Sequence, residues 1–261
     1  AWKWFDHYLK GIDNGVDKEP AVTYYVMGDV SDPKAPGNEW RTANSWPPVK
    51  AKLTPLYLQP DKKLSWKKPL SDGKLSYTYD PKNPVPTIGG YHLTIPAGPM
   101  DQRKIEERSD VLVFTSEPLS EPLEITGSVR AIIWASSDCP DTDFVARLCD
   151  VYPDGRSYNI CEGIIRACLR ESFSQPKWLK PGKIYRFEID LWSTSIIFNK
   201  GHRIRLHITS SSSPGWEPNP NSGKIIHNEA EARIAHNTIY MGPAHPSHIL
   251  LPVIKGGLKD K

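Results

Sequence analysis

The sequence predicts a mainly β protein of the β-sandwich class, and three observations support this prediction. Proline accounts for 25 of the 261 residues, about twice its usual share, and helix-rich domains do not tolerate that density. Several segments, such as RIRLHIT at 203–209, alternate apolar and polar residues, which is the pattern of antiparallel strands with one wet face. Turn sequences such as SDG, DPKNP and PDG separate these segments.

The first 28 residues differ from the rest. Residues 1–10 predict a helix, because Trp2, Phe5, Tyr8 and Leu9 share one face and Gly11 can cap its end. The run PAVTYYVMG that ends at residue 28 is almost continuously apolar, which is typical of a strand buried on both faces. A helix followed by such a strand is half of an α/β layer. Left uncovered, residues 21–28 would pair with another copy in a homo-oligomer or be disordered.

From about residue 46 the alternating pattern takes over, so we divide the chain into residues 1–45 and 46–261. About ten strands and almost no helix are expected in the second part, and the arrangement predicted is a jelly roll. The predicted strands are 53–58, 75–79, 110–116, 122–134, 143–152, 157–170, 183–191, 203–209, 237–241 and 248–254.

Two of these strands show their predicted faces clearly. The core-facing residues expected there are Tyr185, Phe187, Ile189, Leu191, Ile204, Leu206 and Ile208. On the other face of 203–209, Arg203, Arg205 and His207 are expected to meet water. Trp134 and Trp192 lie in or beside strands, so we place both in the core.

Composition excludes several classes of function. The net charge is +3 and the basic residues are scattered, so no nucleic-acid partner is expected. The longest apolar runs are too short to span a bilayer, no signal peptide is visible, and no membrane partner is expected. The four cysteines form no C-x-x-C pair, which favours free thiols and a cytoplasmic location. A turn at Asp154–Gly155 would place Cys149 opposite Ile160.

The residues required for catalysis were sought next. No G-x-S-x-G nucleophile elbow occurs, so the serines at 210–213 are interpreted as a strand end followed by a polar loop. His202 begins a strand after a turn, and a structural role is expected for it. The aspartates at 138–154 could in principle bind Ca²⁺, but they lack the twelve-residue loop pattern. We therefore predict no catalytic residue, no metal and no cofactor.

Several long motifs resemble one family in sequence and in order. They are NEWRTANSWPP, NPVPTIGG, GPMDQRKIEERSDVLVFTSEPL, DTDFVARLCDVYPDGRSYNI, EGIIRACLRES, NKGHRIRLHITSSSSP, NPNSG and PAHPSHILLPVI. Together they resemble the C-terminal part of the CocE/NonD hydrolases, also called X-prolyl dipeptidyl aminopeptidase-like acyl esterases.

The resemblance implies a role for each part of the chain. In that family an α/β-hydrolase domain with a Ser-His-Asp triad and a helical cap packs against a galactose-binding-like jelly roll. Residues 1–45 then correspond to the last helix and strand of the hydrolase domain, and the family's triad maps onto no position here. The implied partners are that catalytic domain, its cap and a small ester or amide substrate.

The loop at 83–102 is the site that the resemblance singles out. In the resembling enzymes a jelly-roll loop helps to close the acyl pocket, and long loops in compact domains are usually functional or disordered. The pocket-wall residues predicted here are Thr87, Ile88, Gly89, Gly90 and Tyr91. Packing between domains, without substrate contact, is the other interpretation of this loop.

The function predicted is therefore that of a non-catalytic C-terminal domain of a serine acyl esterase, amidase or X-prolyl dipeptidyl-peptidase-like hydrolase. The alternative is a freestanding β-sandwich that binds a ligand such as a carbohydrate. The helix and buried-type strand at the N-terminus count against it, because a self-contained module has no use for half of an α/β layer.

Overall fold

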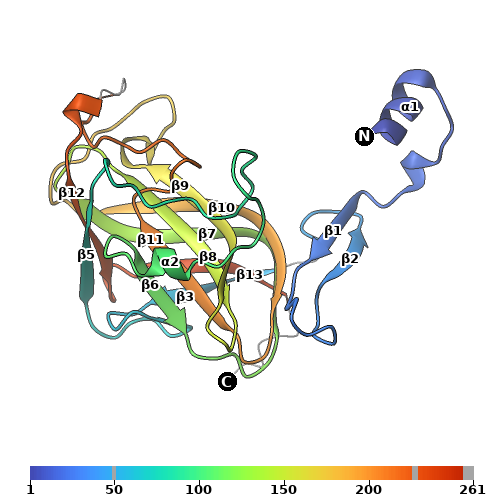
Figure 1. Cartoon of the computed structure of the whole chain (residues 1–261), viewed down its shortest axis with the longest axis horizontal. Helices are drawn as coiled ribbons and strands as arrows, with labels where there is room; N and C mark the ends of the chain where they lie inside the picture. The colour runs from blue at the N-terminus through green and yellow to red at the C-terminus, as the bar shows by residue number, and fades with distance from the viewer. Residues whose placement is uncertain (49–50, 225–228, 255–261) are drawn as a thin grey trace.

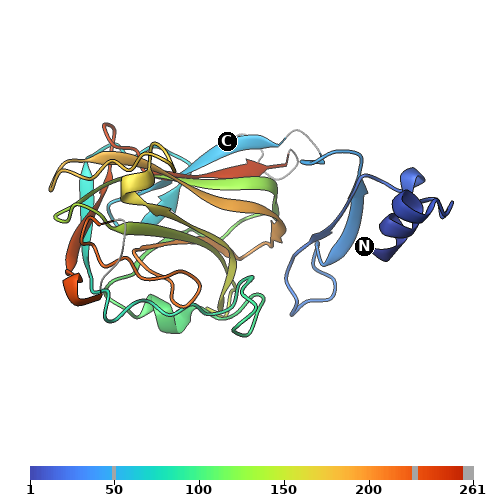
Figure 2. The same ribbon diagram turned by 90° about the horizontal axis from the view of Figure 1, so that it is seen from above.

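The computed structural model describes residues 1–48, 51–224 and 229–254, so parts of the predicted domain 46–261 lie outside the described residues. The chain forms a sandwich of strands with a separate N-terminal segment beside it (Figure 1). That segment contains helix α1 (Trp2–Lys10), the 3₁₀ helix η1 (Val16–Lys18) and a two-stranded sheet of β1 (Val22–Val26) and β2 (Glu39–Ala43). Seen from above, α1 lies at the far end from the sandwich (Figure 2).

The sandwich is built from eleven strands joined by mostly short loops. They are β3 (Lys52–Leu58), β4 (Lys63–Ser65), β5 (Gly73–Tyr79), β6 (Leu112–Ser116), β7 (Leu123–Ser137), β8 (Asp143–Val151), β9 (Ser157–Arg166), β10 (Tyr185–Phe198), β11 (Arg203–Thr209), β12 (Ala235–Met241) and β13 (His248–Val253). Helix α2 (Arg103–Glu106) and the 3₁₀ helices η2 (Ala167–Leu169) and η3 (Glu229–Glu231) interrupt them.

Two layers of strands enclose the core (Figure 2). One layer is organised by β7, which pairs with β10 on one side and with β12 and β13 on the other. The other layer contains β6, β11, β8 and β9 in that order, and β4 connects the layers by pairing with both β3 and β6. This architecture confirms the predicted mainly β sandwich. The finer assignment to a galactose-binding-like jelly roll stays a prediction.

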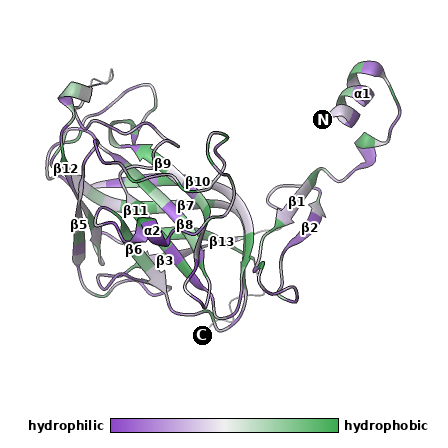
Figure 3. Ribbon diagram, viewed as in Figure 1, coloured by the Kyte–Doolittle hydropathy of each residue, from purple (hydrophilic) through white to green (hydrophobic). Residues whose placement is uncertain are grey.

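The core between the layers contains the residues that alternation predicted. Phe187, Ile189, Leu206 and Ile208 are completely buried, and apolar residues follow the central strands in Figure 3. Strands β9 and β10 do not pair with each other, and they can approach closely because residue 163 is glycine. A Cβ at Gly163 would lie 1.9 Å from the carbonyl oxygen of Asp190.

The structure corrects the prediction that Trp192 belongs to the core. A β-bulge between Asp190 and Ser193 interrupts the pairing of β10 with β7. At this bulge Trp192 has a φ of 68° and donates its backbone N–H to Asp190 Oδ1 over 2.9 Å. Its side chain consequently faces outward and is 66% exposed. Trp134 is half-buried.

Strand β11 also has less contact with water than predicted. His207 is completely buried, and Arg203 and Arg205 are half-buried. The reason is that α2 covers this face, where Glu106 Oε1 lies 3.0 Å from His207 Nε2 and Glu106 also binds Arg205. The sequence pattern did not predict that α2 covers this face, because a covering segment does not change the alternation of the strand beneath it.

The β8–β9 hairpin differs from the predicted register by one residue. Leu148 pairs with Cys161, and a shift then places Cys149 opposite Asn159 instead of Ile160. All four cysteines are free, as predicted. Burial raises the pKa of Cys139 to about 11 and that of Cys168 to about 12, so these thiols stay protonated near neutrality.

The N-terminal segment contacts the sandwich through its second half only. Met27 bridges Ile196 of β10, and Arg41 Nη1 binds Glu124 Oε1 at 2.9 Å. Strand β1 is not buried on both faces as predicted, because among the described residues it pairs in a sheet with β2 alone and its burial alternates along the strand. Within the described residues, no helix has the length and apolar character needed to cross a membrane.

Candidate functional site

The loop at 83–102 lies across the outer face of the layer that contains β8 and β9. Backbone hydrogen bonds fix its first half to the strand end after β11, from Thr87 N to Ser213 O (2.7 Å) and from Ser213 N to Val85 O (2.8 Å). The loop then reverses, and Gly90 and Gly98 exchange two backbone hydrogen bonds of 2.8 Å. This loop is therefore an ordered part of the structure.

Glycine is required at the reversal. Gly89 and Gly90 have φ values of 73° and 87°, a region that other residues rarely adopt. A Cβ on Gly89 would also lie 2.4 Å from the carbonyl oxygen of Gly98. The two glycines thus shape the loop that presents the next residue, Tyr91.

The five residues predicted as pocket wall belong to this loop but differ in exposure. Thr87 and Gly89 are buried, and Ile88 packs on a small apolar cluster beneath the loop. Gly90 is half-buried, and only Tyr91 is exposed, at 56%. Of the five, Tyr91 is therefore the one whose side chain is available to a ligand or a partner domain.

Residues that were not predicted complete the exposed tip. Leu93 is fully exposed, and the ring of Trp192 lies 6.2 Å from the ring of Tyr91 between centroids. Because the β10 bulge turns Trp192 outward, two residues that are far apart in the sequence form one aromatic pair. The GGYHL sequence predicted Tyr91, but no sequence signal located Trp192 beside it.

A buried charged group lies directly under the tip. Arg147 of β8 is 1% exposed and binds Glu162 of β9 at 2.7 Å, while its Nη2 donates to Ser212 Oγ over 3.0 Å. His92 Nε2 lies 3.6 Å from the other oxygen of Glu162. We call Arg147, Glu162, Ser212 and His92 the anchor. It ties the loop to the sheet, since His92 directly follows Tyr91.

The anchor leaves no space on its loop side. A Cβ on Gly215 would lie 2.5 Å from His92 Nε2 and 2.9 Å from Thr87 Oγ1. The ring of Trp216 meets His92 edge-on at 6.0 Å. The position of His92, and with it the position of Tyr91, is therefore determined by the segment after β11.

That segment begins with the serine run, whose hydroxyl groups have structural partners. Ser210 Oγ lies 2.8 Å from Tyr77 Oη, Ser211 Oγ accepts the N–H of Val85 (2.9 Å), and Ser212 Oγ lies 2.9 Å from Thr87 Oγ1. Ser210, Ser211 and Ser212 are all buried. These contacts give the serine run a structural role, as predicted.

Another group has the composition of a catalytic triad but is sealed. Cys149 Sγ lies 3.9 Å from His207 Nδ1, and His207 Nε2 faces Glu106. Both Cys149 and His207 are completely buried. Burial raises the pKa of Cys149 and lowers that of His207, so the thiol carries no reactive charge near neutrality.

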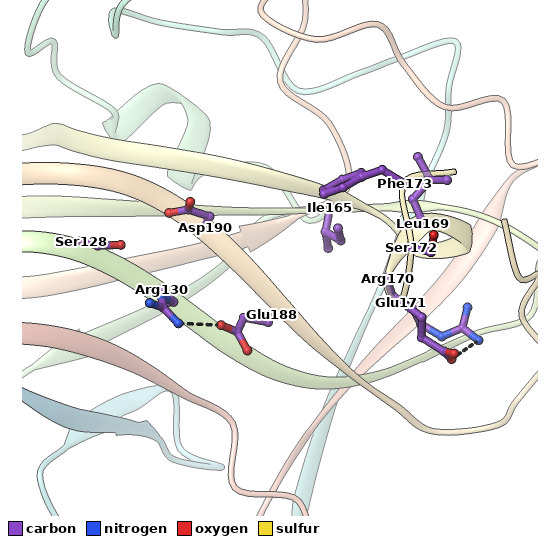
Figure 4. A pocket seen from close by; sticks show the side chains of 10 residues that line it. All are labelled: Ser128, Arg130, Ile165, Leu169, Arg170, Glu171, Ser172, Phe173, Glu188 and Asp190. Atoms are coloured by element: carbon purple, nitrogen blue, oxygen red, sulfur yellow. Dashed lines mark hydrogen bonds and ion pairs between the residues drawn. The ribbon is translucent and has the colours of Figure 1, made fainter. Parts of the chain in front are cut away.

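The outer face of β7 and β10 has a groove of about 400 Å³ (Figure 4). Four of its five charged residues form ion pairs, Arg130 with Glu188 (3.0 Å) and Arg170 with Glu171 (3.2 Å), and the fifth, Asp190, accepts the backbone N–H of Trp192. Phe173 contributes the aromatic side chain of the lining. A saccharide site of the alternative function would need these pairs to open. No group of three or more potential metal ligands occurs among the described residues.

Comparison with known proteins identifies the chain. Cocaine esterase of Rhodococcus sp. (strain MB1 Bresler) is 39% identical over 265 residues, which cover 97% of this chain and 45% of that protein. An α-amino acid ester hydrolase superposes with a TM-score of 0.83 at 30% identity, and an aminopeptidase from a marine sediment archaeon, Thaumarchaeota archaeon, with 0.81 at 31%. These structures match 97% of this chain and 43–44% of their own length.

The fold and these matches define a β-sandwich domain that occurs as one part of longer hydrolases. The family described as the X-Pro dipeptidyl-peptidase C-terminal non-catalytic domain matches residues 14–250. The chain belongs to this family, and the predicted relation to the CocE/NonD hydrolases is confirmed. It spans less than half the length of the relatives that it matches.

Proposed function

We propose that this chain serves a serine acyl esterase or amidase in two ways: it packs on the catalytic α/β-hydrolase domain, and its loop at 83–102 forms part of the acyl pocket. Residues 1–45 are the last helix and strand of that catalytic domain. The names of the similar proteins, an esterase, an ester hydrolase and an aminopeptidase, support acyl transfer from an ester or amide substrate.

One observation carries the packing role. Helix α1 has no buried residue, although it presents a face of large apolar side chains, and Trp2 is 82% exposed. Monomeric soluble proteins rarely expose such a face without a binding partner. A catalytic domain that covers α1 and the free side of β1 would complete the α/β layer begun here.

The pocket role is supported by the exposed tip and its anchor. Tyr91 and Leu93 project from a loop that is fixed at its base by buried hydrogen bonds. Aromatic side chains held in this way lose little entropy on binding. Rigid support of a contact residue is what a specificity-determining wall requires.

The test is made on the enzyme that contains the catalytic domain together with this chain. Tyr91→Ala is expected to alter the ratio of kcat/KM between short and bulky p-nitrophenyl esters by about tenfold or more, since one lost apolar contact is worth about 1–3 kcal/mol in specificity. Phe173→Ala is the control, because Phe173 is also an exposed aromatic residue, at 85%, but lines the groove on the outer face of β7 and β10. An unchanged ratio in Tyr91→Ala would leave packing as the loop's role.

The chain alone is expected to show no hydrolysis of these esters above background. A fluorophosphonate probe should leave it unlabelled, because the serines at 210–212 are buried and none has a histidine partner among the hydrogen bonds of the described residues. Stoichiometric labelling of this run would contradict the non-catalytic assignment of the serines.

A further inference from the structure

The loop between β1 and β2 is joined to the sandwich by an unusual histidine. His202, at the turn before β11, is 1% exposed. Its Nδ1 lies 2.9 and 3.1 Å from the two oxygens of Asp150 in β8. Its Nε2 lies 3.3 Å from Oδ2 of Asp29. Asp29 belongs to the N-terminal segment, so the ring of His202 contacts both the sandwich and that segment.

The ring must carry a proton on both nitrogens to satisfy both carboxylates. Neutral imidazole has one N–H donor, and its second nitrogen carries a lone pair. Whichever nitrogen lost its proton would direct that lone pair at a carboxylate oxygen. In the charged form, both nitrogens donate hydrogen bonds to ionised groups, which are among the strongest that proteins form.

We propose that His202 is a proton-dependent latch that holds the loop at 28–38 on the sandwich. When His202 is protonated, Asp29 is bound and the loop is fixed. When His202 loses its proton, Asp150, which faces Nδ1 with both oxygens, keeps the remaining N–H, and Asp29 loses its donor. The device lies outside the loop at 83–102 and does not depend on the proposed pocket.

The other charged and titratable groups around the ring leave this assignment intact. Tyr152 stacks on His202 at 4.4 Å between centroids and accepts the N–H of Val30 (3.3 Å). Burial raises the pKa of Tyr152 to about 12, so it stays neutral. The guanidinium carbon of Arg156 lies 5.1 Å from the centre of the Tyr152 ring, and the ring centres of Tyr158 and Tyr152 are also 5.1 Å apart. Asp150 and Asp29 are thus the groups that bind the histidine.

The directions of the pKa shifts of His202 and Asp29 agree with the geometry, whereas burial raises the pKa of Asp150. Burial alone would lower the pKa of His202, but the hydrogen bonds and charges of Asp150 and then Asp29 raise it above 6.5. Burial opposes ionisation of Asp29, yet its hydrogen bonds from Ser31 and His202 lower its pKa. A raised histidine pKa gives stability that is complete below about 6.5 and is lost as the pH rises through the folded value.

Hydrogen exchange on the full chain tests the latch. Protection of peptides from 22–43, corrected for intrinsic exchange and divided by that of β10, is measured at pH 5.5 and pH 9.5. The ratio is expected to fall by about tenfold or more at the higher pH, the loss that one charge-assisted hydrogen bond predicts. Asp29→Asn removes the charge but keeps an acceptor for Ser31, and it should give the lower ratio at both pH values.

Asp32→Asn is the control, because Asp32 is a neighbouring exposed carboxylate that accepts the backbone N–H of Lys34. This variant should behave as the unaltered chain. His202→Gln, which cannot be charged, should lose the dependence on pH while β10 stays protected. A ratio that does not change with pH in the unaltered chain, or an Asp29→Asn variant identical to Asp32→Asn, would overturn the proposal.

Discussion

Strand β8 and helix α1 each have nine residues and opposite burial. All nine residues of β8 are buried, including Asp143, Arg147 and Asp150. None of the nine residues of α1 is buried, although Trp2 and Trp4 are among them. Apolar character alone therefore does not decide which residues of these two elements are buried. The charged residues of β8 can be buried because each contacts a group that can carry the opposite charge. The aromatic residues of α1 remain exposed.

The difference teaches how the two parts of the chain obtain stability. The sandwich covers its own core, and the buried carboxylate of Asp143 is paired there, since it binds Arg166 at 3.0 Å and accepts from Asn219 at 2.8 Å. The N-terminal segment contributes edges and faces that the sandwich does not cover. Changes inside β8 should therefore act on this chain alone, whereas changes in α1 should act mainly in the larger protein.

The largest effect is expected from Arg147→Met. It leaves Glu162 as a buried charge with only His92 nearby, and breaking a buried ion pair costs about 3–5 kcal/mol of the free energy of unfolding. Urea denaturation measures this loss. The double variant Arg147→Met/Glu162→Leu should recover most of it, because no charge remains uncompensated. Arg130→Ala, which breaks the exposed pair with Glu188, should cost less than about 1 kcal/mol. Equal losses in Arg147→Met and Arg130→Ala would contradict the comparison.

The next effect depends on pH and concerns Glu106. Burial opposes its ionisation, but the hydrogen bonds from His207, Ser157 and Arg205 lower its pKa to about 2. A lowered carboxyl pKa gives stability that is present above the unfolded value, about 4.5, and is lost as the pH falls toward 2.

Glu106→Gln should therefore lower the free energy of unfolding by about 3 kcal/mol at pH 7 and by much less at pH 2.5. Urea denaturation at both pH values gives the difference between the variant and the unaltered chain. Glu188→Gln, at an exposed ion pair, should change stability by less than about 1 kcal/mol. A Glu106→Gln effect that is the same at both pH values would show that charge is not what α2 contributes.

The smallest effect on this chain is expected from Trp4→Ala. Because Trp4 is 52% exposed, the free energy of unfolding should change by no more than about 0.5 kcal/mol. In the protein that includes the catalytic domain, the same substitution should cost about 2 kcal/mol or more, since the side chain is then buried. Urea denaturation of both forms makes the comparison. Equal small changes in the two forms would argue against docking through α1.

Sequence reasoning located the strands well and the contacts between them poorly. Residues 53–58, 203–209 and 248–254 match β3, β11 and β13 closely, because alternation marks 203–209 and short apolar runs mark the other two. Strand β2 was missed since EWRTA has no such alternation, and β4 has only three residues. The N-terminal helix was predicted from the spacing of its apolar residues, which requires no partner.

The candidate site shows the limit more sharply. Tyr91 was predicted from the loop sequence and the family resemblance. The anchor was not, because Arg147 and Glu162 are neighbours only across the β8–β9 hairpin and His92 reaches them only through the fold of the loop. Trp192 was misplaced because a bulge reverses which way a residue points. The domain boundary at residue 45 and the pocket role of residues 87–91 stay predictions.

Because Gly215 has no side chain, a substitution at this position offers a way to change the loop at 83–102 by protein engineering. An alanine there would compete with His92 and Thr87 for the same space, and the nearest structure free to yield is the loop tip. A library at residue 215 would therefore vary the placement of Tyr91 and Leu93 without changing either of them.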